Sequence, residues 1–186
     1  MGHRDFSSAG VILPAAAIAL LAACSPTFNW RDVPMADGDL TALLPCKPDR
    51  AERAIPLGGE TVTVQMAGCE AGDATFAIAS ARAGDAVQAD AWLAAWRAST
   101  RAQWQAATGG QISESAVSVV RAAPKPEPWQ LEARGADPAG RPNEARVRWF
   151  AHLQRDGSVA IYQATVLGKP SAGDATSTFF DGLRLP

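Results

Sequence analysis

Three cysteines and His152 carry the most versatile side-chain chemistry in this sequence. Cys24 follows a run of apolar residues, whereas Cys46, Cys69 and His152 lie well beyond that run. A thiol can be acylated, oxidised to a disulfide or bound to a metal, and an imidazole can transfer a proton or bind a metal. A structural zinc site usually has four ligands, and only one histidine follows the apolar run. These residues therefore predict neither a metal site nor a cofactor site.

The segment before Cys24 has the features of an export signal. Val11 to Ala23 is apolar apart from the imino acid Pro14, and it is shorter than the roughly 20 residues that a helix needs to cross a bilayer. Its length fits the apolar core of a secretory signal that is removed after export. The run ends in Leu21-Ala22-Ala23-Cys24, which resembles the lipobox of bacterial lipoproteins. The resemblance implies diacylglyceryl transfer to the Cys24 sulfur, cleavage before Cys24 and N-acylation of the new terminus.

The lipobox resemblance predicts a membrane-tethered protein of the bacterial cell envelope. Two or three acyl chains hold a protein stably, because each buried methylene contributes about 0.8 kcal/mol. In enterobacterial lipoproteins, a residue other than Asp after the cysteine favours the outer membrane over the inner one, and here that residue is Ser25. We therefore expect a periplasmic domain anchored to membrane lipid through Cys24. Secretion with cleavage near Ala23 and an uncleaved N-terminal anchor are the alternatives.

If Cys24 carries lipid, two cysteines remain, Cys46 and Cys69, and an even number of cysteines can pair. Export to an oxidising compartment makes a disulfide between them the expected state. In the chain-entropy model, such a bond stabilises the fold by roughly 3 kcal/mol. Two free buried thiols are the alternative.

Motifs of common catalytic centres are missing from the sequence. It contains no Gly-x-Ser-x-Gly, no His-Glu-x-x-His and no phosphate-binding loop. A Ser-His-Asp hydrolase would have to use His152, which lies in an expected strand without a nucleophile signature around it. In the same region, Arg146, Arg148, His152 and Arg155 predict a basic patch for an anionic headgroup or an acidic partner. A solvated sheet face is the alternative reading of these four residues.

The overall charge argues against a general nucleic-acid binder. The formal net charge is -2 at pH 7, so the chain lacks the basic excess that such proteins carry. Its length of 186 residues suits one domain with a sizeable core.

Hydrophobic periodicity predicts strands on both sides of one long helix. Thr61 to Ala67 alternates between apolar and polar residues, as a half-buried strand does. Asp85 followed by Gln88 resembles a capping box, and Gly109-Gly110 is expected to end the helix. The helix carries a tryptophan stripe that is expected to pack on the sheet; its members are Trp92, Trp96 and Trp104. Further strands are expected over residues 40–44, 54–57, 74–82, 116–121 and 129–134.

A hairpin is predicted near the end of the chain. Strands over residues 146–154 and 159–167 flank Asp156-Gly157, and Asp-Gly is a strong signal for a two-residue type I′ turn. That turn would place Trp149 opposite Ala164 and would collect the apolar residues of both strands on one continuous face.

These elements predict an α+β fold. It consists of a mainly antiparallel sheet, one long helix after the first strands and a short C-terminal helix capped by Asp174. The strand ending at Leu44-Pro45, the Asp-Gly hairpin and the terminal Phe179-Phe180 helix resemble the PsbP-type α/β/α sandwich. We expect residues 1–23 to be removed, residues 24–38 to form a lipidated tether and residues 39–186 to form one globular domain.

The sequence leaves three functional hypotheses. The first is a non-enzymatic lipoprotein that binds or supports an unknown envelope protein. The second is a carrier that holds a lipid, sugar or aromatic ligand between the sheet and the Trp-bearing helix. The third is a hydrolase that uses His152. The PsbP resemblance implies the first, because members of that family are mostly accessory factors without catalytic activity.

Overall fold

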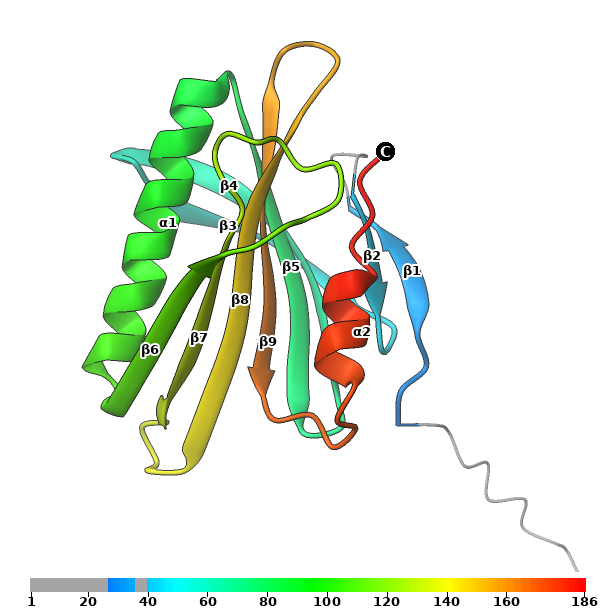
Figure 1. Ribbon diagram of the computed structural model, residues 1–186, viewed down its shortest axis with the longest axis vertical. Coiled ribbons are helices and arrows are strands. Elements are labelled where there is room, and N and C mark those ends of the chain that lie inside the picture. Colours follow the sequence, from blue (N-terminus) through cyan, green and yellow to red (C-terminus); the bar gives the residue numbers. More distant parts are fainter. Residues whose placement is uncertain (1–26, 36–39) are drawn as a thin grey trace, which may run out of the picture.

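The computed structural model describes residues 27–35 and 40–186, which contain nine strands and two helices (Figure 1). Seven strands form one antiparallel sheet in the order β3-β4-β5-β9-β8-β7-β6, and β1 pairs with β2 separately. The expected α+β fold, with a long helix after the early strands and a short C-terminal helix, is confirmed. In chain order the elements are β1 (Arg31–Pro34), β2 (Thr41–Leu44), β3 (Asp49–Leu57), β4 (Glu60–Ala71), β5 (Ala74–Ala83), α1 (Ala86–Ala106), β6 (Thr108–Ala116), β7 (Trp129–Ala136), β8 (Pro142–Leu153), β9 (Val159–Gly168) and α2 (Ala175–Asp181).

The large sheet lies between two layers that bury different side chains. α1 packs on one face, where Trp92 and Trp96 join a core with Trp149. α2 and the β1–β2 pair cover part of the other face, where Phe76 and Phe179 lie in a second core (Figure 1). Because side chains alternate between the two faces of a strand, the central strands supply both cores. No helix in the described part of the chain is both long and apolar enough to cross a membrane.

α1 begins at the predicted cap but ends earlier than expected. Asp85 Oδ1 accepts a hydrogen bond from the Gln88 N–H at 2.8 Å. The Gln88 side chain accepts a bond from the Gly84 N–H at 2.7 Å, one residue before the position used in a capping box. The helix ends at Ala106, because Ala107 adopts an extended conformation that leads directly into β6.

The strand expected over residues 116–121 is misplaced. β6 occupies residues 108–116 instead and pairs with β7, with a register shift between Thr108 and Gln111. Gly109 lies in this irregularity with φ of 67°, a left-handed conformation that glycine adopts without steric cost. β6 is an edge strand and is largely exposed. It therefore lacks the apolar alternation on which strand prediction depends, and residues 117–128 form a loop.

The β8–β9 hairpin forms with a longer loop than the expected Asp-Gly turn. The Gln154 N–H donates to the Ser158 carbonyl at 2.8 Å, so residues 155–157 form a three-residue connection. Gly157 has φ of 87°, as expected for the left-handed residue that closes such a loop.

This loop shifts the register of the hairpin by one residue. Trp149 lies opposite Gln163 and not opposite Ala164. Side chains alternate with a period of two, so the shift moves every β9 side chain to the other face of the sheet. Ile161 consequently joins the α1 core and Tyr162 joins the α2 core. The predicted continuous apolar face is wrong, and both faces of the hairpin combine apolar and polar residues.

Replacing Gln163 with Leu is expected to lower the free energy of unfolding by about 1–3 kcal/mol. Trp149 is 1% exposed, and its indole N–H donates to Gln163 Oε1 at 2.9 Å. Leucine would leave that buried donor without its acceptor. Gln111→Leu, on the exposed edge strand β6, is the control and should change stability by less than about 0.5 kcal/mol. Urea denaturation measures the free energy of unfolding of both variants. Equal losses in the two variants would contradict a stabilising role for the bond between Trp149 and Gln163.

The folded part of the chain begins before residue 39. Phe28 and Trp30 pack on Phe76, with ring centroids 6.4 and 6.1 Å from its ring. β1 pairs with β2 and buries Val33, which is 4% exposed. Burial of these apolar side chains draws residues 28–34, which were expected to be tether, into the fold. Cys24 and the expected signal over residues 1–23 lie outside the described residues.

Candidate functional site

The predicted disulfide between Cys46 and Cys69 is present. Their Cα atoms are 6.0 Å apart, a separation typical of disulfides. Cys46 follows β2 and Cys69 lies in β4. The bond therefore links the two-stranded layer covalently to the seven-stranded sheet.

The two arginines of β8 each contact side chains of neighbouring elements. Arg146 Nε lies 3.0 Å from Glu132 Oε1. The Arg148 guanidinium lies 4.3 Å above the Phe180 ring, and its Nε donates to Gln130 Oε1 at 2.7 Å. Burial lowers the pKa of Arg148. Through these contacts the two arginines link β8 to its neighbours, β7 and α2.

His152 and Arg155 lie at the end of β8 and in the hairpin loop. His152 Nδ1 is 3.2 Å from the Arg121 carbonyl oxygen. A carbonyl oxygen only accepts, so this ring nitrogen donates the hydrogen bond. Within the described residues, no Ser, Asp or Glu side chain forms a hydrogen bond with His152. The arrangement that the hydrolase hypothesis requires is therefore not formed by those residues.

Side chains fill most of the space between α1 and the sheet that the carrier hypothesis requires. An open cavity of about 420 Å³ remains at its edge, where Trp92 lies beside Gln88 and residues of β4 and β5. Trp92 and Trp96 are 7% and 8% exposed, and both belong to the core between α1 and the sheet. Trp104 packs against the same core. The tryptophan stripe therefore serves to dock α1, as aromatic side chains with large buried areas commonly do.

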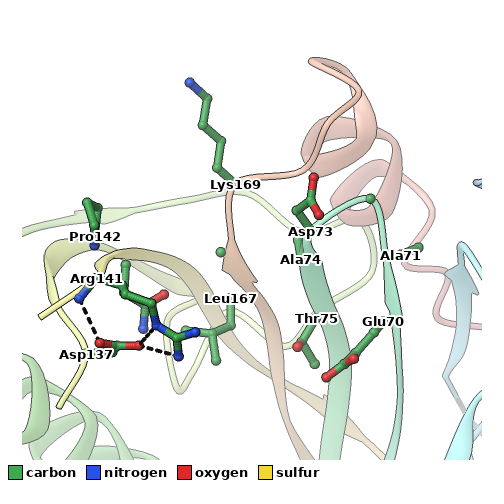
Figure 2. A pocket seen from close by; sticks show the side chains of 13 residues that line it. Glu70, Ala71, Asp73, Ala74, Thr75, Asp137, Arg141, Pro142, Leu167 and Lys169 are labelled. Atoms are coloured by element: carbon green, nitrogen blue, oxygen red, sulfur yellow. Dashed lines mark hydrogen bonds and ion pairs between the residues drawn. The ribbon is translucent and has the colours of Figure 1, made fainter. Parts of the chain in front are cut away.

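An open cavity of about 780 Å³ lies beside the β4–β5 turn and the β7–β8 loop. Glu70, Arg141 and Lys169 give its lining charges of both signs. Figure 2 shows Lys169 extending away from Arg141, which is held by Asp137 at 2.7 Å. Among the described residues, this lining contains no histidine or cysteine. No group of three or more His, Cys, Asp or Glu side chains in the described ranges is placed to hold a metal.

Asp137 is expected to titrate below the usual range of an aspartate. The Arg141 backbone N–H and then the Arg141 side chain bond its carboxylate and lower the pKa of Asp137. A carboxyl pKa that is lower in the folded state contributes stability above its unfolded value near 4. That contribution is lost as the pH falls through the folded pKa.

An NMR titration of the Asp137 carboxyl carbon checks this expectation. Arg141→Gln should raise the midpoint of Asp137 because the side-chain bond and the positive charge are removed. Asp156 is the internal control, since the Ser158 hydroxyl and N–H are the main groups that lower its pKa. An unchanged Asp137 midpoint in the variant would contradict the role given to Arg141.

Among the solved structures that match this chain in a structural comparison is LpqN of Mycobacterium tuberculosis, which is described as involved in cell envelope biogenesis. The TM-score is 0.44 at 15% sequence identity, over 83% of this chain and 85% of that chain. No protein-family model and no curated protein matches the sequence.

Proposed function

We propose that this chain is a membrane-tethered lipoprotein of the cell envelope, with a non-enzymatic binding or accessory module facing the periplasm. The observation that carries the proposal is the tetrapeptide Leu21-Ala22-Ala23-Cys24 at the end of the apolar run from Val11. The order of an apolar run, small residues and a cysteine provides an export signal and an acylation site together. Ser25 favours the outer membrane over the inner one.

The disulfide between Cys46 and Cys69 supports export. Such bonds persist in oxidising compartments such as the periplasm and are rare in the cytosol. The folded residues also begin close to the acylation site, because Phe28 already packs on the core. A short connection to the lipid would keep the module near the membrane surface.

A binding role is favoured by how the candidate chemical groups are used. His152 bonds a backbone carbonyl, Arg146 pairs with Glu132 and Arg148 stacks on Phe180. Each of these side chains stabilises the fold through a contact within the chain. None of these contacts couples a nucleophile to a base, which is what covalent catalysis needs.

Intact-mass analysis of the protein extracted from membranes tests the tether. We expect a terminus at Cys24 that carries acyl chains, and we expect Cys24→Ala to abolish both acylation and cleavage. Ser25→Asp is a second variant, and it should move the protein toward the inner membrane in a density gradient. A water-soluble product beginning after residue 24, or a wild-type protein that retains residues 1–23, would overturn the proposal.

A further inference from the structure

An apolar pocket of about 270 Å³ lies between the start of α1, the 117–128 loop and the β8–β9 hairpin. Pro124, Leu153 and Val159 supply apolar lining, and Arg121 and Lys125 line it as well. These residues come from segments far apart in the sequence, so only the tertiary fold brings them together. In Figure 1, the 117–128 loop and the hairpin turn lie together at the upper end of the molecule.

One exposed apolar side chain lines this pocket, and two others are sequence neighbours of lining residues. Leu153, in its lining, is 59% exposed. Val120 is 78% exposed and precedes Arg121, while Val87 is 81% exposed and follows the lining residue Ala86. These are three of the four large hydrophobic residues that are exposed in the described ranges. An exposed apolar residue at a pocket with apolar lining is typical of an interaction site.

The positive charges at the pocket are not neutralised within the fold. Neither Arg121 nor Lys125 forms an ion pair in the described part of the chain, whereas Arg82 nearby pairs with Asp156 at 3.0 Å. The carboxylate of Asp85, just before α1, is used as a helix cap. Complementary charge on a partner would therefore be negative.

Hydrogen bonds to backbone groups hold the wall of the pocket in place. The Ala123 N–H donates to the Ala151 carbonyl at 2.7 Å, which fastens the loop to β8. The Arg121 carbonyl accepts a bond from His152, although Arg121 has φ of 63°, a conformation that is unfavourable for a residue other than glycine. A wall that is already ordered lowers the entropic cost of binding.

We propose that this pocket docks an extended segment of a partner protein, which inserts a large apolar side chain and presents carboxylates to Arg121 and Lys125. Its volume lies just below the roughly 300–1,000 Å³ of small-molecule pockets and suits a single anchoring side chain. Such anchors, seated in a pocket and surrounded by polar contacts, provide most of the affinity of protein interfaces.

The position of the pocket favours a protein over bilayer lipid, a point that rests on the proposed tether. Phe28 lies beside Gly72 in the β4–β5 turn, whereas the other end of β5 pairs with Val159 of the pocket. β5 has 10 residues, which corresponds to about 30 Å. A protein anchored through Cys24 would thus hold the pocket away from the membrane.

Peptide binding to the purified protein tests the docking site. The protein is taken from membranes into phosphatidylcholine nanodiscs, or from the soluble fraction if no lipid is attached, so failure of the tether leaves binding measurable. The probe is a capped hexapeptide with a central Leu-Phe pair between two pairs of glutamates. Matched peptides replace the glutamates with lysines or the central pair with alanines. Calorimetry should show binding at least tenfold tighter for the acidic apolar probe than for either control.

Variants locate the binding and distinguish the possible occupants. Leu153→Asp and the double change Arg121→Gln with Lys125→Gln should each weaken the probe at least tenfold. Lys169→Glu, at the other cavity, should leave binding unchanged. Leu153 is exposed, so its replacement should preserve the fold, which circular dichroism verifies. The proposal would be overturned if the affinity did not depend on peptide charge or were unchanged in the Leu153→Asp variant. So would binding of dodecanoate at Leu153 without binding of the peptide.

Discussion

Replacing Phe76 with Ala is expected to lower the free energy of unfolding by about 4 kcal/mol. Phe76 is fully buried and lies at the centre of an aromatic cluster. Its ring centroid is 6.4 Å from Phe28, 6.1 Å from Trp30 and 5.6 Å from Phe179. Truncation would open a cavity beneath three segments at once, and packed interiors relax only partly to fill such a space. Guanidinium denaturation measures the loss.

The control for this change is Val87→Ala, at a position that is 81% exposed. It should change stability by no more than about 0.5 kcal/mol. Phe76→Ala should also increase hydrogen exchange in β1, because the ring that supports Phe28 and Trp30 would be gone. A Phe76 variant as stable as the control would mean that the cluster does not hold the N-terminal segment on the sheet.

Replacing both Cys46 and Cys69 with Ala is expected to destabilise the protein by about 3 kcal/mol. The bond closes a loop with a sequence separation of 23 residues, and its loss gives the unfolded chain more freedom. It also removes the covalent link between the β1–β2 layer and the large sheet. The change is measured by thermal and denaturant unfolding under oxidising conditions.

A reducing agent provides the matched control for the cysteine variant. Dithiothreitol should destabilise the wild-type protein by a similar amount and should leave the double variant unchanged. If reduction affects both proteins equally, its effect does not act through this disulfide. If the double variant unfolds at the wild-type midpoint, the link between the two layers contributes nothing measurable.

Local signals predict the elements whose cause lies within a few residues. Asp85 caps α1 because its side chain reaches the Gln88 N–H, and that contact needs only the correct spacing. The alternation from Thr61 to Ala67 predicts part of β4, since a half-buried strand imposes a period of two. β6 is not predicted because it is an exposed edge strand. It places few side chains in the core and therefore lacks the apolar alternation that marks a strand.

The register of the β8–β9 hairpin is not determined by the sequence of its loop alone. Asp156-Gly157 correctly predicts a turn, but the choice between two and three loop residues sets the register. That choice is decided by which pairing buries the aromatic side chains. In the observed register Trp149 reaches Gln163, and Tyr162 stacks on Phe150 with ring centroids 5.1 Å apart. Both contacts follow from packing on the two faces and have no signature in the loop itself.

The sequence by itself determined the α+β composition, the helix cap, the pairing of Cys46 with Cys69 and the lipobox-like tetrapeptide that carries the proposed tether. Each of these depends on residue types at short spacing or on counting cysteines. Only the tertiary structure decided the hairpin register, the partners of Arg146 and Arg148, and the pocket around Leu153. These features depend on which distant strands and loops meet, because ion pairs, burial and cavities form between segments that the chain brings together only on folding.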